Sequence, residues 1–112
     1  MPNSDCLFCK IAKKEIATEI LKEEENIIVF KDINPQAPVH ILIVPKKHIE
    51  WKDDLKKEDL ELLSELILVA KKIAQKENIE KAFKLVFNVG QTAHFPHIHL
   101  HLLGGWRGKI PQ

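Results

Sequence analysis

The pattern of apolar and polar residues takes two different forms along this chain, and each form predicts one type of secondary structure. Short apolar runs that suit β-strands occupy the segments 19–33, 39–48, 82–90 and 97–103. The first run divides into two strands around a polar turn near Glu24 to Asn26, and the second run ends at Pro45 and a basic pair. The pattern therefore predicts five strands.

Between the third and fourth of these strands the apolar spacing changes to the 3.6-residue period of an α-helix. The apolar positions of this helix are Leu60, Leu62, Leu63, Leu66, Ile67, Val69, Ala70, Ile73 and Ala74. They cover about half of the helix circumference, which is wider than the ~100° stripe that one core contact requires. We therefore expect a second buried surface, most simply a second copy of the chain in a homodimer. The alternative is a helix that lies deep in its own core.

A shorter helix is predicted at 6–16, with Leu7, Phe8 and Ile11 pointing inward. The segment 32–38, "DINPQAP", interrupts the pattern because its two prolines favour an extended loop. Five strands with one long helix between the third and the fourth predict an α+β fold with a mostly antiparallel sheet. Because no repeat or linker divides the sequence, we expect a single domain over residues 1–112.

Composition and charge narrow the choice of partner. The 112 residues include 17 basic and 16 acidic side chains, which give a formal charge of +1. This balance offers no electrostatic reason to expect nucleic acid or an anionic membrane as the partner. The longest apolar run is too short to cross a bilayer, and the opening "MPNSDCLFCK" lacks the apolar centre of a signal peptide. We therefore expect a cytoplasmic protein.

The strand at 97–103 carries an unusual set of histidines. Side chains alternate between the two faces of a strand, so His97, His99 and His101 project together while the apolar residues between them face the core. Imidazoles buried on such a face need partners for their ring nitrogens. The alternative is a solvated strand face that tolerates histidine, but the strict alternation, followed at once by two glycines, favours a site.

The residues around this strand favour a phosphate ligand. Neighbouring imidazoles on one face are about 6.5 to 7 Å apart at the backbone, which lets two of them meet one tetrahedral anion. Asn88 and the turn behind it offer an amide and backbone donors, and Gly104 and Gly105 permit close backbone approach. Metal binding by all three histidines is the alternative, although metal ligands usually converge from several elements.

The sequence resembles a known family in three places. "HIHLHLL" is similar to the signature of the histidine triad (HIT) superfamily, and "DINPQAPVHILIVPKKH" resembles the stretch that precedes it in the Hint branch, the histidine triad nucleotide-binding proteins. "CLFCKI" resembles the N-terminus of bacterial and archaeal members of that branch. The likeness covers nearly the whole chain in the right order.

The resemblance implies a nucleotide-binding α+β fold that dimerises through its long helix. It also implies hydrolysis of purine nucleoside 5′-phosphoramidates, or related nucleoside monophosphate adducts, through a covalent nucleotidyl-histidine. By position, His99 would be the nucleophile, His101 would bind the phosphate oxygens, and His40 would support the triad from the preceding strand. 

The same resemblance implies the residues that bind substrate. Asp32 and Ile33 match the positions that bracket the ribose, Phe8 would wall the base, and Asn88 would meet the phosphate. His94 stands where the Hint branch usually has serine or another small donor, so it either donates the leaving-group proton or is a surface loop residue.

The tail departs from the family as well. Only "WRGKIPQ" follows the glycine pair. In the family this tail often reaches the partner subunit's site. Trp106 and Arg107 either do so here in abbreviated form or form an exposed tail with the tryptophan packed on its own domain.

Cys6 and Cys9 have a C-x-x-C spacing that lets two thiolates meet one Zn²⁺. Superfamily members with this pair complete a structural zinc site with the histidine of "PKKH" and the first triad histidine, which are His48 and His97 here. His94 is an alternative fourth ligand. The alternative to a metal is two reduced, partly buried cysteines with His48 exposed.

Three other functions compete with the phosphoramidase. A dinucleoside polyphosphate hydrolase, as in the Fhit branch, is the closest, but the cysteine pair, the proline loop and the double glycine look more like Hint. A nucleotide-binding regulatory module with little turnover is the second. A purely structural zinc protein is the third, and it would leave His99 and His101 without a purpose.

Overall fold

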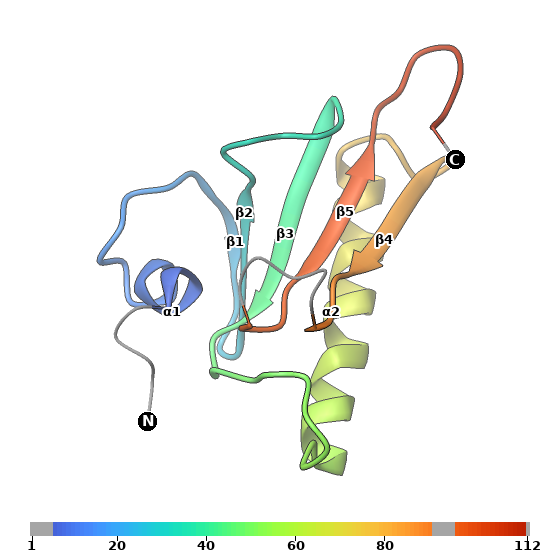
Figure 1. Ribbon diagram of the computed structural model, residues 1–112. Coiled ribbons are helices and arrows are strands. Elements are labelled where there is room, and N and C mark those ends of the chain that lie inside the picture. The colour runs from blue at the N-terminus through green and yellow to red at the C-terminus, as the bar shows by residue number, and fades with distance from the viewer. Residues whose placement is uncertain (1–5, 91–95, 112) are drawn as a thin grey trace.

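The computed structural model describes residues 6–90 and 96–111. Its elements, in chain order, are α1 (Leu7–Ala12), β1 (Ile20–Glu23), β2 (Ile27–Lys31), β3 (Val39–Pro45), α2 (Lys57–Lys76), β4 (Phe83–Phe87) and β5 (Leu100–Gly104). The strands form one five-stranded sheet in the order β1-β2-β3-β5-β4 (Figure 1). Every neighbouring pair is antiparallel. The predicted α+β fold is confirmed.

Side chains alternate between the two faces of each strand, so both faces of the sheet can carry apolar residues. Each of the two helices packs against one of these faces. On one face, Ile41 and Ile43 of β3 and Leu102 of β5 pack with Leu66 and the other buried residues of α2. On the other face, α1 packs against a second apolar cluster: Cys6, Phe8, Cys9, Ile11, Ile28, Phe30, Leu42 and Val44. Figure 1 shows α1 beside β1 and β2.

The register between β3 and β5 brings distant histidines together. Leu42 pairs with His101, and His40 pairs with Leu103. His40 and His101 therefore sit on the same face in diagonal positions, close enough for long or aromatic side chains to touch.

Regular pairing of the histidine strand begins later than predicted. β5 starts at Leu100, and the preceding residues are held by a single bridge between His97 and Glu50 and by the Ile98 N–H, which donates to the Ile49 carbonyl at 2.7 Å. Leu100 is the last residue paired with both neighbours, with Ile43 of β3 and with Phe87 of β4, and β4 ends there while β3 continues to Pro45. The alternation of faces nevertheless continues through the preceding segment, because Ile98 packs in the α2-side core while His97 and Phe8 meet on the other face.

The glycine pair does not provide the predicted close backbone approach next to the histidines. Gly104 pairs with Val39 and Phe83 at the far end of β5, three residues beyond His101. A Cβ at Gly104 would lie 2.6 Å from Ile79 Cδ1, so this glycine permits close packing of the turn after α2. Gly105 has φ +81, a backbone conformation that L side chains rarely adopt, and turns the chain out of the sheet.

The long helix is more apolar than its own core contact requires. Leu60, Ile67 and Leu68 are 49%, 45% and 52% exposed, although seven other residues of α2 are buried. This confirms the predicted excess of apolar surface. The homodimer itself stays a prediction, and a molar mass near 12.9 kDa in solution at all concentrations would contradict it. Within the described residues, no helix is long and apolar enough to cross a membrane.

Candidate active site and metal centre

The end of β3, the first turn of α1 and the segment before β5 assemble a cluster of two thiols and two imidazoles. The Sγ atom of Cys6 lies 3.3 Å from His97 Nδ1, and the Sγ atom of Cys9 lies 3.1 Å from His48 Nδ1 and 3.5 Å from His97 Nδ1. Cys6 is the N-cap of α1, where its sulfur accepts from the Cys9 N–H at 3.4 Å. One helical turn therefore aims both sulfurs at the histidines.

The protons of these histidines lie on the outside of the cluster. His97 Nε2 donates to the Pro45 carbonyl at 2.8 Å, and His48 Nε2 donates to the Glu50 carboxylate at 2.9 Å. A neutral imidazole carries one N–H, so both Nδ1 atoms present lone pairs to the sulfurs. Burial lowers the pKa of His97 to about 4, which keeps this imidazole neutral at neutral pH. Outward donation to a carbonyl or carboxylate is how metal-binding histidines are usually held.

The four residues fit a tetrahedral metal. All four ligand atoms lie within 4.8 Å of one another. In a tetrahedron with ordinary Zn–S and Zn–N bond lengths, sulfur and nitrogen are about 3.6 Å apart, close to the distances found here. Two thiolates and two imidazoles are a usual donor set for structural zinc. The predicted ligands Cys6, Cys9, His48 and His97 thus come together as a cluster able to bind a metal.

A second cluster lies next to the first along the histidine strand, and His99 stands at its centre. His99 is buried, and its Nδ1 donates to the main-chain carbonyl of His97 at 2.8 Å. The lone pair of this imidazole is therefore on Nε2. The ring of His99 lies 4.6 Å from the ring of Phe8 and 4.8 Å from that of His101, measured between centroids. A buried imidazole that is oriented in this way is suited to nucleophilic attack in its neutral form.

His101 is oriented by side chains from two other elements. Its Nδ1 lies 2.9 Å from His40 Nε2, and its Nε2 lies 3.2 Å from the carboxamide nitrogen of Asn88. Asp32 Oδ2 lies 3.4 Å from His40 Nε2. Burial is the main reason that the pKa of His101 falls to about 4, with repulsion from His99 next, and burial also lowers the pKa of His40. Both imidazoles are therefore neutral at neutral pH.

The low pKa of His101 makes the stability of the fold sensitive to acid. The unfolded chain binds a proton here below about pH 6.5, whereas the folded chain binds it only near pH 4. The free energy of unfolding should therefore fall as the pH decreases through this window. Urea unfolding at several pH values measures the slope, and the variant His101→Gln should show a shallower one. Equal slopes would contradict the prediction.

Asp32, His40 and His101 also place ligand atoms within 4.8 Å of one another. The main-chain N–H of Gln36 donates to His40 Nδ1 at 3.0 Å, which puts the proton of His40 on Nε2, inside the cluster. A metal would have to displace that proton. The second cluster is thus a hydrogen-bonded network, and the position of the protons distinguishes it from the metal cluster.

The remaining predicted residues lie near this network. Ile33 is 81% exposed beside Asp32, and Phe8 is 3% exposed, with its ring 6.0 Å from that of Phe30. Asn88 follows β4 and contacts His101. His94 lies outside the described residues. Sequence reasoning did not identify Gln36 or Glu50. Gln36 acts through its main-chain N–H, which does not depend on the residue type, and nothing in the sequence distinguishes Glu50 from the other acidic residues.

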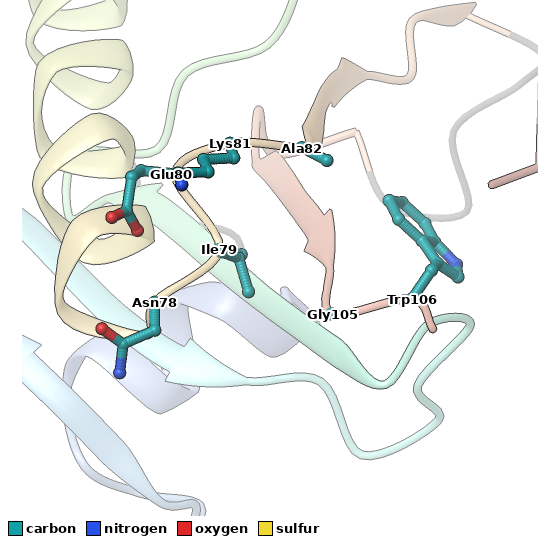
Figure 2. A pocket seen from close by; sticks show the side chains of 7 residues that line it. All are labelled: Asn78, Ile79, Glu80, Lys81, Ala82, Gly105 and Trp106. Atoms are coloured by element: carbon teal, nitrogen blue, oxygen red, sulfur yellow. The ribbon is translucent and has the colours of Figure 1, made fainter. Parts of the chain in front are cut away.

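A separate hollow of about 380 Å³ lies at the other end of β5, where Gly105 and Trp106 face the turn after α2 (Figure 2). The histidines do not line it. Trp106 is half-buried, and Lys84 Nζ lies 5.7 Å from the centre of its ring. Trp106 thus has a contact on its own chain, and the reach of the tail to a partner subunit's site stays a prediction.

Comparison with known proteins agrees with this geometry. Residues 5–108 match the family described as scavenger mRNA decapping enzyme C-term binding. A HIT-like protein of Synechocystis sp. is 45% identical over 105 residues, 90% of each chain, and a 14 kDa zinc-binding protein of Zea mays is 42% identical over 115 residues, 99% of this chain and 90% of that one.

The fold comparison extends the likeness to a solved structure. The crystal structure of a HIT family hydrolase from Legionella pneumophila is 48% identical, with a TM-score of 0.87 over 96% of this chain and 98% of that one. Sequence, fold and the three alternating histidines thus lead to one conclusion: this chain belongs to the histidine triad superfamily.

Proposed function

We propose that this protein is a member of the Hint branch that hydrolyses purine nucleoside 5′-phosphoramidates, or related nucleoside monophosphate adducts. The observation that carries the proposal is the orientation of His99: its Nδ1 proton is held by the His97 carbonyl, which makes Nε2 the nitrogen that would attack phosphorus. The relative from Legionella pneumophila, named a HIT family hydrolase, supports hydrolysis as the reaction class.

The reaction would proceed in two displacements. His99 Nε2 attacks the phosphorus, the P–N bond to the amine breaks, and the amine leaves with the electron pair and takes up a proton. Water then attacks the nucleotidyl-histidine, the bond between phosphorus and Nε2 breaks, and the nucleoside monophosphate is released. Two displacements replace one difficult step by two easier ones. Of the two roles that the sequence leaves open for His94, the proton donor is the one that would supply the proton for the amine.

The other residues of the network would recognise the nucleotide. With its proton on Nε2, His101 would present an N–H to the phosphoryl oxygens, and Asn88 lies beside it. Asp32 and the exposed Ile33 would bracket the ribose at the start of the proline loop. Phe8 would wall the base, and the contact of its ring with that of His99 supports this role.

We propose zinc as the metal of Cys6, Cys9, His48 and His97. The donor set and the outward-facing imidazole protons support it, as does the name of the relative from Zea mays. The metal would supply a structural link that joins α1, the end of β3 and the segment before β5. We further propose that the protein acts as a cytoplasmic homodimer of single domains, without nucleic-acid or membrane partners.

The test of the proposed reaction is intact-protein mass spectrometry after brief incubation with adenosine 5′-phosphoramidate and quenching without acid. We expect a transient adduct of one AMP on the wild type and none on His99→Ala. If folded wild-type protein shows no adduct and releases no AMP, the phosphoramidase is excluded. An adduct with diadenosine polyphosphate alone would instead favour the dinucleoside polyphosphate hydrolase.

A further inference from the structure

The proline loop between β2 and β3 folds back onto His40 through its main chain. The Asp32 N–H donates to the His40 carbonyl at 3.1 Å, and the Gln36 N–H donates to His40 Nδ1 at 3.0 Å. Within the loop, the Asn34 N–H donates to the Asp32 carboxylate at 2.8 Å. The His40 side chain is 2% exposed, its contact with the Gln36 N–H is partly buried, and the contact between Asn34 and Asp32 lies at the surface.

The Gln36 contact decides which nitrogen of His40 carries the proton. A main-chain N–H can only donate, so His40 Nδ1 accepts and the single proton of the neutral ring is on Nε2. Nε2 lies 2.9 Å from His101 Nδ1 and 3.4 Å from Asp32 Oδ2. The shorter contact requires His101 Nδ1 to accept. The proton of His101 is then on Nε2. This tautomer requires the Asn88 carboxamide, whose nitrogen lies 3.2 Å from Nε2, to turn its oxygen toward that proton.

We infer that the main-chain N–H of Gln36 is a positioning group for this site. This N–H fixes the tautomer of His40 and, through His40, the tautomer of His101. It also keeps a proton at the position that a metal ion would otherwise occupy. The inference rests on the proposed function only in assigning the Nε2 proton of His101 to the phosphoryl oxygens. The tautomers and the exclusion of metal follow from the contacts themselves.

A consequence is that His40 orients His101 but does not shuttle protons. A shuttle through the ring would need a proton on Nδ1, where the Gln36 N–H already points. Without the Gln36 N–H, His40 can carry its proton on Nδ1 and turn a lone pair toward His101. Asp32, His40 and His101 would then offer one carboxylate and two imidazole lone pairs, a donor set that binds divalent transition metals.

The variant Gln36→Pro removes this donor, and Gln36→Ala is the matched control that keeps it. The Gln36 side chain is exposed, and prolines already lie at positions 35 and 38, so the loop is extended before the change. The measurements are histidine ring ¹⁵N–¹H correlation spectra, zinc content after equilibration with Zn²⁺, and kcat and KM for adenosine 5′-phosphoramidate.

We expect wild type and Gln36→Ala to show His40 and His101 protonated on Nε2 and to hold equal amounts of zinc. Gln36→Pro should show His40 protonated on Nδ1, bind one more zinc per chain than wild type, and lose about 10²-fold in kcat with little change in KM. If residue 36 had only a structural role in the loop, its substitution would change neither the tautomers nor the zinc content.

Two results would overturn the inference: a wild-type His40 protonated on Nδ1, or a Gln36→Pro variant with unchanged tautomers and zinc content. The first result is measured on the wild type, so it tests the inference even if the Gln36→Pro variant does not fold. Failure of the proposed function looks different, because wild type would then lack phosphoramidase activity while the tautomers remain as inferred.

Discussion

The variant His99→Asn should lose on the order of 10⁴-fold in kcat/KM for adenosine 5′-phosphoramidate. Asparagine can still donate to the His97 carbonyl, so the strand should keep its conformation, but its amide nitrogen has no lone pair to attack phosphorus. Without the covalent intermediate, water must displace the amine directly. The loss should fall on kcat, because the contacts proposed for His101, Asn88 and Asp32 with the nucleotide would remain.

His101→Gln is the informative comparison, because it changes the next histidine on the same face. Glutamine keeps an N–H donor for the phosphoryl oxygens, and the loss should be nearer 10²-fold, with the nucleotidyl adduct still detectable. Stopped-flow release of the amine measures both variants, and thermal unfolding checks that each is folded. Equal losses in the two variants would show that His99 has no special role as nucleophile.

Removing the metal should lower the midpoint of thermal unfolding by about 15 °C. A ligand present at a thousand times its dissociation constant adds about 4 kcal/mol to the free energy of unfolding, and each kcal/mol shifts the midpoint by about 4 °C in a chain of this size. The α2-side core contains none of the four ligands, so we expect a less stable fold rather than an unfolded chain. Scanning calorimetry with and without a chelator measures the shift.

Two variants distinguish the effect of losing the metal from any other effect of the chelator. The double variant Cys6→Ser, Cys9→Ser should unfold at the lower temperature with or without chelator. Glu50→Gln weakens the acceptor that holds His48 Nε2, and it should reduce zinc affinity by about 10- to 100-fold while leaving the four ligands in place. A wild-type midpoint that does not respond to the chelator would contradict a structural metal.

The sequence predicts the site through residue types that repeat at the period of their element. Three histidines at alternate positions predict a shared face whatever the fold, and the proline loop and the polar turn mark where strands end. The register between β3 and β5, which brings His40 to His101, depends on how complete strands pack. Single-sequence patterns do not contain that information.

The parts that sequence reasoning missed act through the main chain or through common residues. The Gln36 N–H, the Pro45 carbonyl and the His97 carbonyl each fix one imidazole, and any residue at the last two positions would provide the same atom. The strand boundary at Leu100 was also missed, because it depends on where the neighbouring strands end rather than on the histidine segment itself.

His97 serves both clusters, but with different atoms: its imidazole faces the cysteines, and its carbonyl orients the nucleophile. Mutation can remove the first without touching the second. In evolutionary terms the two properties are separable, so a descendant of this protein that lost its cysteines would be free to change residue 97 and still keep a correctly aligned His99. Metal dependence can therefore drift within a lineage while the chemistry at phosphorus stays the same.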